Sequence, residues 1–305
     1  MRYSPPPQKL ALLVQSHTPS VRRMNNLRSL IKISVFCGSV MLALATSAAP
    51  PPQHVPVPGG IAVIQLPTAA EGAPTYKGRR VLVATINDER FAVVGIPLFA
   101  KPGVHEIRLG DTALTFDVAD KVYREQRLTI KNRRQVNPLP EDLERIRNDR
   151  AEMDEAFRHF EPAPAVTEFS LPATGPISSP FGLKRFLNDQ PRSPHSGLDI
   201  AAPEGDPITA PAAGKVVVVG DYFFNGKTVL IDHGQGLITM YCHMSKTSVV
   251  VDDRVAEGDL LGEIGETGRV TGAHLHWAVS LNDTRVDPNL FLNNESKAAQ
   301  TDAGS

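Results

Sequence analysis

Short apolar runs separated by turn residues dominate the chain from residue 60 onward, and this pattern predicts β-strands rather than long helices. The first group of runs covers 61–66, 80–86, 91–96, 104–109, 113–118 and 126–130. Turn residues such as Asn87-Asp88 and Gly110-Asp111 lie between them. Several short strands at this spacing predict an immunoglobulin-like β-sandwich. No catalytic cluster falls in this segment, so we expect it to act in spacing or binding.

The next segment, 140–160, changes to helical periodicity. Apolar residues recur on one stripe while charges occupy the other positions, and the stripe consists of Leu143, Ile146, Met153, Phe157 and Phe160. Prolines at 162 and 164 end the pattern. We expect a connector helix packed on one of the domains, in preference to a coiled coil that binds a partner.

Strands return after residue 169 and are dense, at 215–219, 227–232, 237–243, 259–264 and 274–281. A faint internal echo, in which Gly205-Asp206 and Gly258-Asp259 precede similar runs, is consistent with a duplicated hairpin. The fold class is therefore mainly β, with an antiparallel C-terminal domain. Residues after Asn293 are small and polar, and we expect a disordered tail.

The N-terminal segment has the composition of a secretory signal peptide. Basic residues at 28 and 32 precede an apolar centre at 33–45, and small residues at 47–49 resemble a cleavage site. The apolar centre is too short for a membrane span, and Met24 would give a leader of ordinary length. The expected organisation is a signal peptide (1–49), a Pro-rich linker (50–58), an accessory β-sandwich (59–136), a connector helix and linker (137–168), a catalytic-type β-domain (169–293) and a tail (294–305).

Composition narrows the choice of function. Apolar residues make up 41% and charged residues 21% of the chain, which is typical of a globular protein. A net charge of -1 gives no basic footprint for nucleic acid. The two cysteines, Cys37 and Cys242, offer no disulfide framework once the leader is removed. Cys242 precedes His243, but a buried strand residue is a more common role for a free cysteine than a nucleophile.

Candidate chemistry is confined to the C-terminal segment. His195 lies four residues before Asp199, His243 ends a predicted strand, and His274 and His276 are two apart. Residues two apart on a strand face the same side, so the last two should point into one cavity. Imidazole and carboxylate are good zinc ligands, and a catalytic zinc uses three protein ligands. Four histidines and one aspartate supply three ligands and two histidines for acid–base work.

These residues resemble the LytM/lysostaphin-type zinc metalloendopeptidases, which degrade peptidoglycan. The likeness runs through Phe181-Gly182, the segment 195–200, Ala210-Pro211, Asp232-His233-Gly234 and the segment 265–277, and covers about 169–292. His233 itself is interpreted as a turn residue with a polar contact.

The resemblance implies a role for each residue of the cluster. It makes His195, Asp199 and His276 the ligands of one Zn²⁺ per chain. It makes His243 and His274 the catalytic pair, without saying which of them is the base. Tyr241 and Arg269 could line the substrate groove, although Tyr241 is an equally good packing residue.

The resulting hypothesis is a periplasmic zinc endopeptidase that cuts peptide cross-links, with peptidoglycan stem peptides as substrate and no stable membrane span after cleavage of the signal. A bond between D-alanine and diaminopimelate is the expected target. A regulatory protein could bind the N-terminal domain, and the helix 141–161 could rest across the groove and limit activity. Two other interpretations are a non-enzymatic cell-wall or divisome adaptor that activates a separate amidase, and a phosphoryl carrier.

Overall fold

The computed structural model describes residues 52–68 and 71–303. The expected signal peptide, with Met24 and Cys37, lies outside these described residues. Within them, no helix is both long and apolar enough to cross a membrane.

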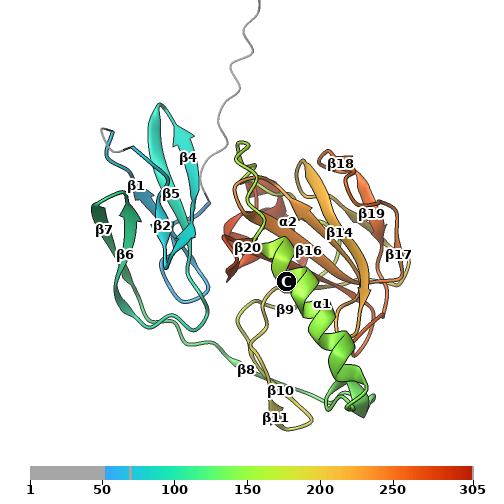
Figure 1. The fold of residues 1–305 in the computed structure, drawn as a ribbon. Coiled ribbons are helices and arrows are strands. Elements are labelled where there is room, and N and C mark those ends of the chain that lie inside the picture. Colours follow the sequence, from blue (N-terminus) through green and yellow to red (C-terminus); the bar gives the residue numbers. More distant parts are fainter. Residues whose placement is uncertain (1–51, 69–70, 304–305) are drawn as a thin grey trace, which may run out of the picture. The chain divides into compact units, whose positions relative to one another are not determined.

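The first part of the described chain is a sandwich of two small antiparallel sheets. One sheet has the order β1 (Ile61–Gln65), β5 (Glu89–Gly95), β4 (Leu82–Ile86). The other has the order β3 (Arg79–Arg80), β2 (Thr75–Tyr76), β6 (Gly103–Leu109), β7 (Thr112–Val118). Asn87 and Asp88, both with positive φ, join β4 to β5, as a two-residue hairpin requires. The expected N-terminal sandwich is therefore confirmed (Figure 1).

The strand that follows leaves this sandwich. β8 (Glu125–Leu128) pairs in parallel with β10 (Lys184–Leu187), which also pairs with β11 (Gln190–Pro191). The sequence pattern predicted a strand here but assigned it to the sandwich. Its partner lies about sixty residues away along the chain, and strand propensity alone does not encode such a pairing. The 3₁₀-helix η1 (Arg133–Gln135) comes next.

The C-terminal domain is built on one antiparallel sheet, as the sequence pattern predicted. Its order is β18 (Arg254–Val255), β14 (Gly214–Tyr222), β15 (Gly226–Asp232), β16 (Leu237–Met244), β20 (His274–Leu281), β12 (Leu198–Ala201), β9 (Ile177–Ser179), with β21 (Arg285–Val286) beside β20. A small second sheet has the order β13 (Pro207–Thr209), β19 (Leu260–Glu263), β17 (Lys246–Thr247). Side chains of both sheets form a common core.

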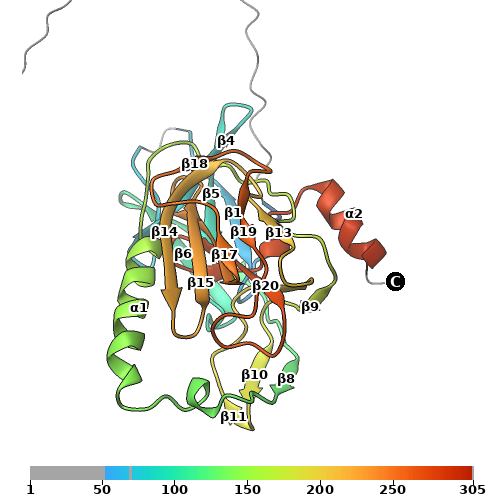
Figure 2. The same ribbon diagram turned by 90° about the vertical axis from the view of Figure 1, so that its right-hand side faces the viewer.

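Helix α1 (Asp142–Phe157) lies against the other face of the large sheet (Figure 1 and Figure 2). Phe157 and Met153 pack there with Tyr222 and Cys242. The predicted apolar stripe is wrong at its first member, because Leu143 is 46% exposed. The buried residue at that end is Asp142, whose carboxylate accepts hydrogen bonds from the Arg134 side chain at 2.6 and 2.8 Å.

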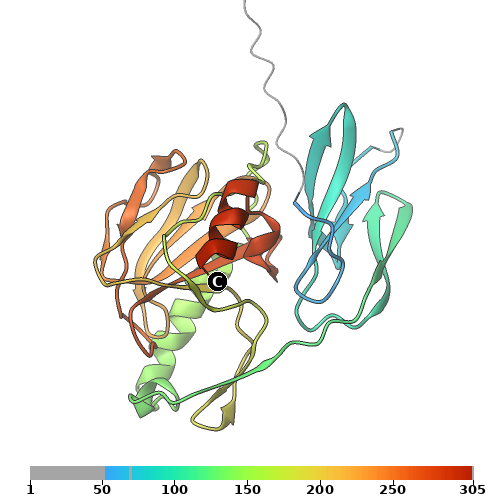
Figure 3. The ribbon, with the colours of Figure 1, turned by 180° about the vertical axis from the view of Figure 1, so that it is seen from behind.

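The expected disordered tail is also wrong over most of its length. After the 3₁₀-helix η2 (Pro288–Leu290), residues Asn294–Ala303 form helix α2 (Figure 3). Asn293 Oδ1 accepts a hydrogen bond from Ser296 N at 2.8 Å, which caps the first turn. Ser296 Oγ in turn accepts from Leu171 N at 3.0 Å and ties the helix to the domain.

Candidate metal centre

Neighbouring strands β12 and β20 bring the first two candidate residues together. Asp199 and His276 are directly opposite in the register, and His274 pairs with Ala201 two positions along. The side chain of Leu275, between the two histidines, is fully buried in the core. The predicted common face of His274 and His276 is thus present, because period-2 alternation holds along this strand.

His195 reaches the same point from the loop before β12. Its backbone N–H donates to Leu183 O at 2.9 Å, and its ring Nδ1 donates to Pro180 O at 2.8 Å. Gly197 makes room for the neighbouring ring, since a Cβ there would lie 2.7 Å from His276 Cε1. These contacts fix the ring of His195 with Nε2 turned toward Asp199.

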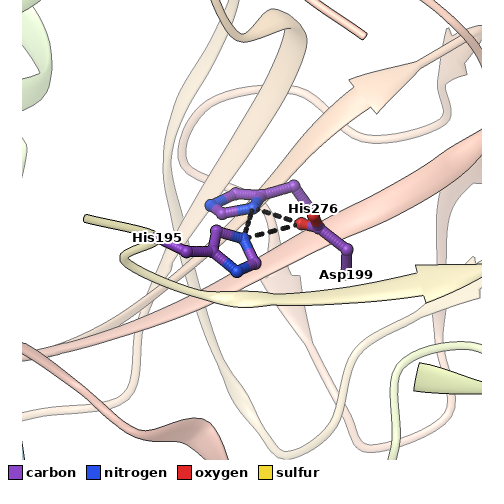
Figure 4. A group of neighbouring side chains, drawn as sticks. All are labelled: His195, Asp199 and His276. Atoms are coloured by element: carbon purple, nitrogen blue, oxygen red, sulfur yellow. Dashed lines mark hydrogen bonds and ion pairs between the residues drawn. The ribbon is translucent and has the colours of Figure 1, made fainter. Parts of the chain in front are cut away.

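The three groups converge on one point (Figure 4). His195 Nε2 lies 2.9 Å from Asp199 Oδ1 and 3.0 Å from His276 Nδ1, and His276 Nδ1 lies 2.7 Å from Asp199 Oδ1. Because Nδ1 of His195 donates to a carbonyl, its neutral ring offers only a lone pair at Nε2. That lone pair and a carboxylate oxygen face each other, and both are satisfied when a cation lies between them. The set therefore fits a metal ion bound by two imidazoles and one carboxylate.

The electrostatics of this cluster favour the ligand forms of its members. Burial opposes ionisation of Asp199, but the adjacent rings of His195 and His276 hold the pKa of its carboxyl well below the usual range. Burial lowers the pKa of His276 to about 4, against the opposing effect of Asp199. An ionised carboxylate beside a neutral imidazole is the state that metal ligation requires.

Arg185 holds the other oxygen of the carboxylate. Its Nη2 donates to Asp199 Oδ2 at 2.7 Å, while its Nε donates to Gln126 Oε1 at 3.2 Å. Oδ1 is thereby left for the metal, and the orientation of the carboxylate is fixed. Sequence analysis missed Arg185, because its closeness to Asp199 depends on the position of β10, which no local pattern encodes.

His243 and His274 stand beside the metal cluster. Their rings lie 4.8 Å apart, and the ring of His243 lies 6.1 Å from that of His276. His243 Nδ1 donates to Thr267 O and His274 Nδ1 donates to Gly272 O, each at 2.8 Å. Burial, with the charges of His274 and His276, lowers the pKa of His243 to about 3. The Nε2 atoms of both rings thus remain as proton acceptors.

An unusual backbone conformation places His243 in this group. Its φ is 67°, in the left-handed region that few non-glycine residues adopt. Tyr241, two residues before it, packs in the common core of the two sheets, so regular alternation would have directed the His243 side chain into the same core and away from the metal cluster. The break in alternation brings the ring to the metal cluster, and conformations of this kind concentrate at functional sites.

Two cavities adjoin the cluster, and both are lined by His243 and Arg269. The larger, of 480 Å³, also contains His195 and His276 in its wall, together with Met153 of α1. The smaller, of 300 Å³, contains Asp199 and His274. Arg269, a candidate substrate-binding residue, therefore lies where that role requires.

Tyr241, the other candidate for substrate binding, does not line either cavity. Its side chain is fully buried, and its hydroxyl lies 2.8 Å from Thr239 Oγ1. The structure therefore contradicts the substrate-binding prediction and places Tyr241 in the core packing. Side-chain alternation along β16 accounts for this position.

Two further groups are structural. Burial raises the pKa of the Cys242 thiol to about 12, which removes the thiolate that a nucleophile needs. His233 lies outside the metal cluster, where its Nδ1 donates to Ala213 O and its Nε2 lies 2.8 Å from Thr239 Oγ1. It lies in the turn between β15 and β16 and makes these polar contacts, as the sequence suggested, and its side chain is buried.

Comparison with known proteins agrees with this geometry. Residues 193–288 match the family described as peptidase family M23, and residues 54–121 match the peptidase family M23 N-terminal domain. A solved structure described as an M23 peptidase of Pseudomonas aeruginosa is 46% identical, with a TM-score of 0.65, and the match covers 78% of this chain and 95% of that one.

Curated relatives match over a shorter segment. DD-carboxypeptidase/endopeptidase Mpg of Neisseria meningitidis is 38% identical over 112 residues, which is 37% of this chain and 26% of the relative. Peptidoglycan DD-endopeptidase ShyA of Vibrio cholerae is 40% identical over 102 residues, which is 33% of this chain and 24% of the relative. The match thus spans about a quarter of the length of these curated relatives.

Proposed function

The chain belongs to peptidase family M23, and we propose that it is an exported zinc metalloendopeptidase that hydrolyses peptide cross-links of bacterial peptidoglycan. The observation that supports this most directly is the convergence of His195 Nε2, Asp199 Oδ1 and His276 Nδ1, no two of which are more than 3.0 Å apart. Two further imidazoles beside a three-ligand centre fit a hydrolase better than a closed structural site.

In this proposal His195, Asp199 and His276 hold one Zn²⁺. A bound zinc lowers the pKa of a water molecule toward neutrality and polarises a carbonyl oxygen. The chain contributes a ligand set that is already assembled, with Arg185 holding the carboxylate and the Pro180 carbonyl holding the first imidazole. Pre-oriented ligands of this kind reduce the reorganisation that metal binding needs.

His243 and His274 have the roles of proton acceptor and donor. Each directs Nδ1 to a backbone carbonyl, which leaves Nε2 to take the proton of the attacking water or, once protonated, to donate to the oxyanion. The lowered pKa of His243 keeps its ring neutral, so that Nε2 has a lone pair to accept a proton. The two rings, 4.8 Å apart, are close enough to act on the same tetrahedral centre.

The substrate and location follow from the surroundings and the relatives. The two cavities, both lined by His243, suit an extended peptide whose scissile bond lies at the metal cluster. The relatives named as peptidoglycan DD-endopeptidases support a cell-wall substrate, with D-alanyl–diaminopimelate as the proposed bond. The signal-like segment 28–49 supports export to the periplasm.

The test combines metal content with wall cleavage. The protein, its His276→Ala variant and a His54→Ala control are analysed for zinc and incubated with purified peptidoglycan. His54 is exposed and lies outside the cluster. We expect one zinc per chain and release of uncross-linked peptides from the protein and the control, and loss of both in His276→Ala.

Two results would contradict the proposal in different ways. Absence of bound zinc in the unaltered protein would refute the metal site. Zinc bound without any cleavage would instead favour the adaptor interpretation, and one relative matched over 134 residues at 36% identity is named cell division protein DipM. That adaptor would then be expected to stimulate a separate amidase with His276→Ala as well as with the unaltered protein.

A further inference from the structure

Arginines surround the larger cavity next to the metal cluster. Arg185, Arg192 and Arg269 all line it, together with three of the five cluster residues. Arg185 is paired with Asp199, as described above. Among the described residues, no carboxylate forms an ion pair with Arg192 or Arg269. Two guanidinium groups without an ion-pair partner thus line this cavity, and the single carboxylate that the described chain contributes to its wall, Asp149, forms no ion pair with either of them.

The contacts that hold Arg269 in place leave most of its N–H donors free to bind a ligand. Its guanidinium stacks on the ring of Phe224 at 4.4 Å, and its backbone N–H donates to Phe224 O at 2.9 Å. Its side chain makes one hydrogen bond in the described structure, from Nη1 to Gln135 O, at the long distance of 3.4 Å. A guanidinium has five N–H donors, so a stacked, planar group with one weak bond is prepared for a two-oxygen acceptor.

Positive charges near Arg269 also favour the binding of an anion in this cavity. Burial, followed by the charges of Arg185 and Arg192, lowers the pKa of Arg269 to about 10. Arg192 donates to Val136 O at 2.8 Å and to Gln190 Oε1 at 2.6 Å, which fixes it at the cavity wall without neutralising it. An anionic group in the cavity would relieve this repulsion.

We propose that Arg269, assisted by Arg192, binds a free carboxylate of the substrate peptide next to the bond that is cut. This inference rests on the proposed function, because it concerns the substrate of the same site. Arg269 lines both cavities around His243, so a carboxylate held there lies beside the reacting bond on either side of the metal cluster.

The chemistry selects one class of cross-link. In a diaminopimelate cross-link, the carbon that carries the acylated amine also carries a free carboxylate. Lysine differs from diaminopimelate by the absence of this one carboxylate. Cross-links of a diamino diacid should therefore be cleaved in preference to cross-links of lysine or glycine.

The decisive experiment compares two synthetic cross-linked tetrapeptide dimers that differ only in this group, one with diaminopimelate and one with lysine. We expect kcat/KM of the unaltered protein to be at least about tenfold higher for the diaminopimelate dimer, the size expected for charge-assisted hydrogen bonds. Amidation of the same carboxylate should reduce the value to that of the lysine dimer. Equal rates on all three substrates would overturn the inference and leave the proposed function intact.

Two variants test whether Arg269 causes the preference for the diaminopimelate dimer. Arg269→Gln should bring the two dimers within about threefold of each other, by slowing the diaminopimelate dimer only. Arg147→Gln removes the same charge from an exposed position of α1 and should keep the full preference. A preference retained in Arg269→Gln would refute the assignment to Arg269. Circular dichroism checks that the variants fold, and the amidated substrate tests the inference on the unaltered protein if they do not.

Binding gives a measure that does not depend on turnover. Calorimetry on the metal-free protein compares the two tetrapeptide products that carry the freed amine, one with diaminopimelate and one with lysine at the third position. The first should bind at least about tenfold more tightly, and Arg269→Gln should remove the difference. If neither dimer is cleaved, the proposed function fails while this binding ratio still decides the inference, because equal affinities would refute it.

Discussion

His233 offers a quantitative test of the core, because its protonation state is coupled to folding. Its Nδ1 donates to Ala213 O at 2.8 Å, so Nε2 of the neutral ring accepts from the Thr239 hydroxyl at 2.8 Å. The residue is 3% exposed, and its ring lies 4.9 Å from Phe169. A proton on Nε2 would place a charge in this core and oppose the hydroxyl donor.

The direction and size of the effect follow from linkage. Burial lowers the pKa of His233 from 6.5 to about 4 in the folded protein. The unfolded chain therefore binds the proton first as the pH falls, so this contribution to stability is complete above pH 6.5 and is lost between about pH 6.5 and pH 4. Between pH 7.5 and pH 5 the loss from this residue amounts to about 2 kcal/mol.

Urea unfolding measures this loss when the protein is compared with a His233→Asn variant, which does not titrate. Trp277, the single tryptophan and fully buried, reports unfolding by its fluorescence. Both proteins are studied with chelator, so that titration of the metal ligands is common to the two. The unaltered protein should lose about 2 kcal/mol more than the variant between pH 7.5 and pH 5, with unchanged m-values.

Parallel stability curves for the two proteins over this pH range would refute the reasoning. They would mean that the imidazole keeps its ordinary pKa when the protein folds, and hence that water reaches the ring. A larger loss in the variant would be equally incompatible with a neutral, buried His233.

Three further predictions concern the metal site and its surroundings. Gly197→Ala should weaken zinc binding at least about tenfold in chelator competition, because its Cβ would lie 2.7 Å from His276 Cε1; unchanged affinity would contradict this crowding. Arg185→Gln should weaken zinc binding by about 10–100-fold, because it frees the second oxygen of the carboxylate ligand. Tighter binding would show that charge repulsion by the guanidinium outweighs its positioning effect. Cys242→Ala should keep hydrolysis of peptidoglycan and lose about 1 kcal/mol of unfolding free energy, because the thiol is a buried core group; abolished hydrolysis in a folded variant would restore the thiol as a candidate nucleophile.

Most of the architecture could be predicted because the strands follow from patterns of neighbouring residues in the sequence. Short apolar runs bounded by turn residues predicted the strands of both β-domains, and period-2 alternation correctly placed His274 and His276 on one face. The same rule does not anticipate His243, whose left-handed φ turns it out of the alternation that buries Tyr241. Backbone conformations of this type depend on the surrounding structure and leave no trace in a hydropathy pattern.

The features that the sequence analysis missed depend on side-chain contacts and strand pairings that a hydropathy pattern does not show. The position of Arg185 beside Asp199 requires β10 to be placed by its pairing with β8. The exposure of Leu143 follows from the burial of Asp142, which Arg134 neutralises. Helix α2 forms on a polar segment because Asn293 caps it. In each case a specific side-chain contact, which a hydropathy pattern does not contain, decides the outcome.

The parallel pairing of β8 with β10 links the metal cluster to the strand that follows the N-terminal sandwich. Gln126 lies opposite Arg185 in this register, and its Oε1 accepts a hydrogen bond from the guanidinium that holds Asp199. The strand that leaves the N-terminal sandwich is therefore connected through two side chains, Gln126 and Arg185, to the carboxylate of Asp199. A fragment that starts at residue 169 would keep the whole cluster of histidines and aspartate, yet it would lack the strand that braces it.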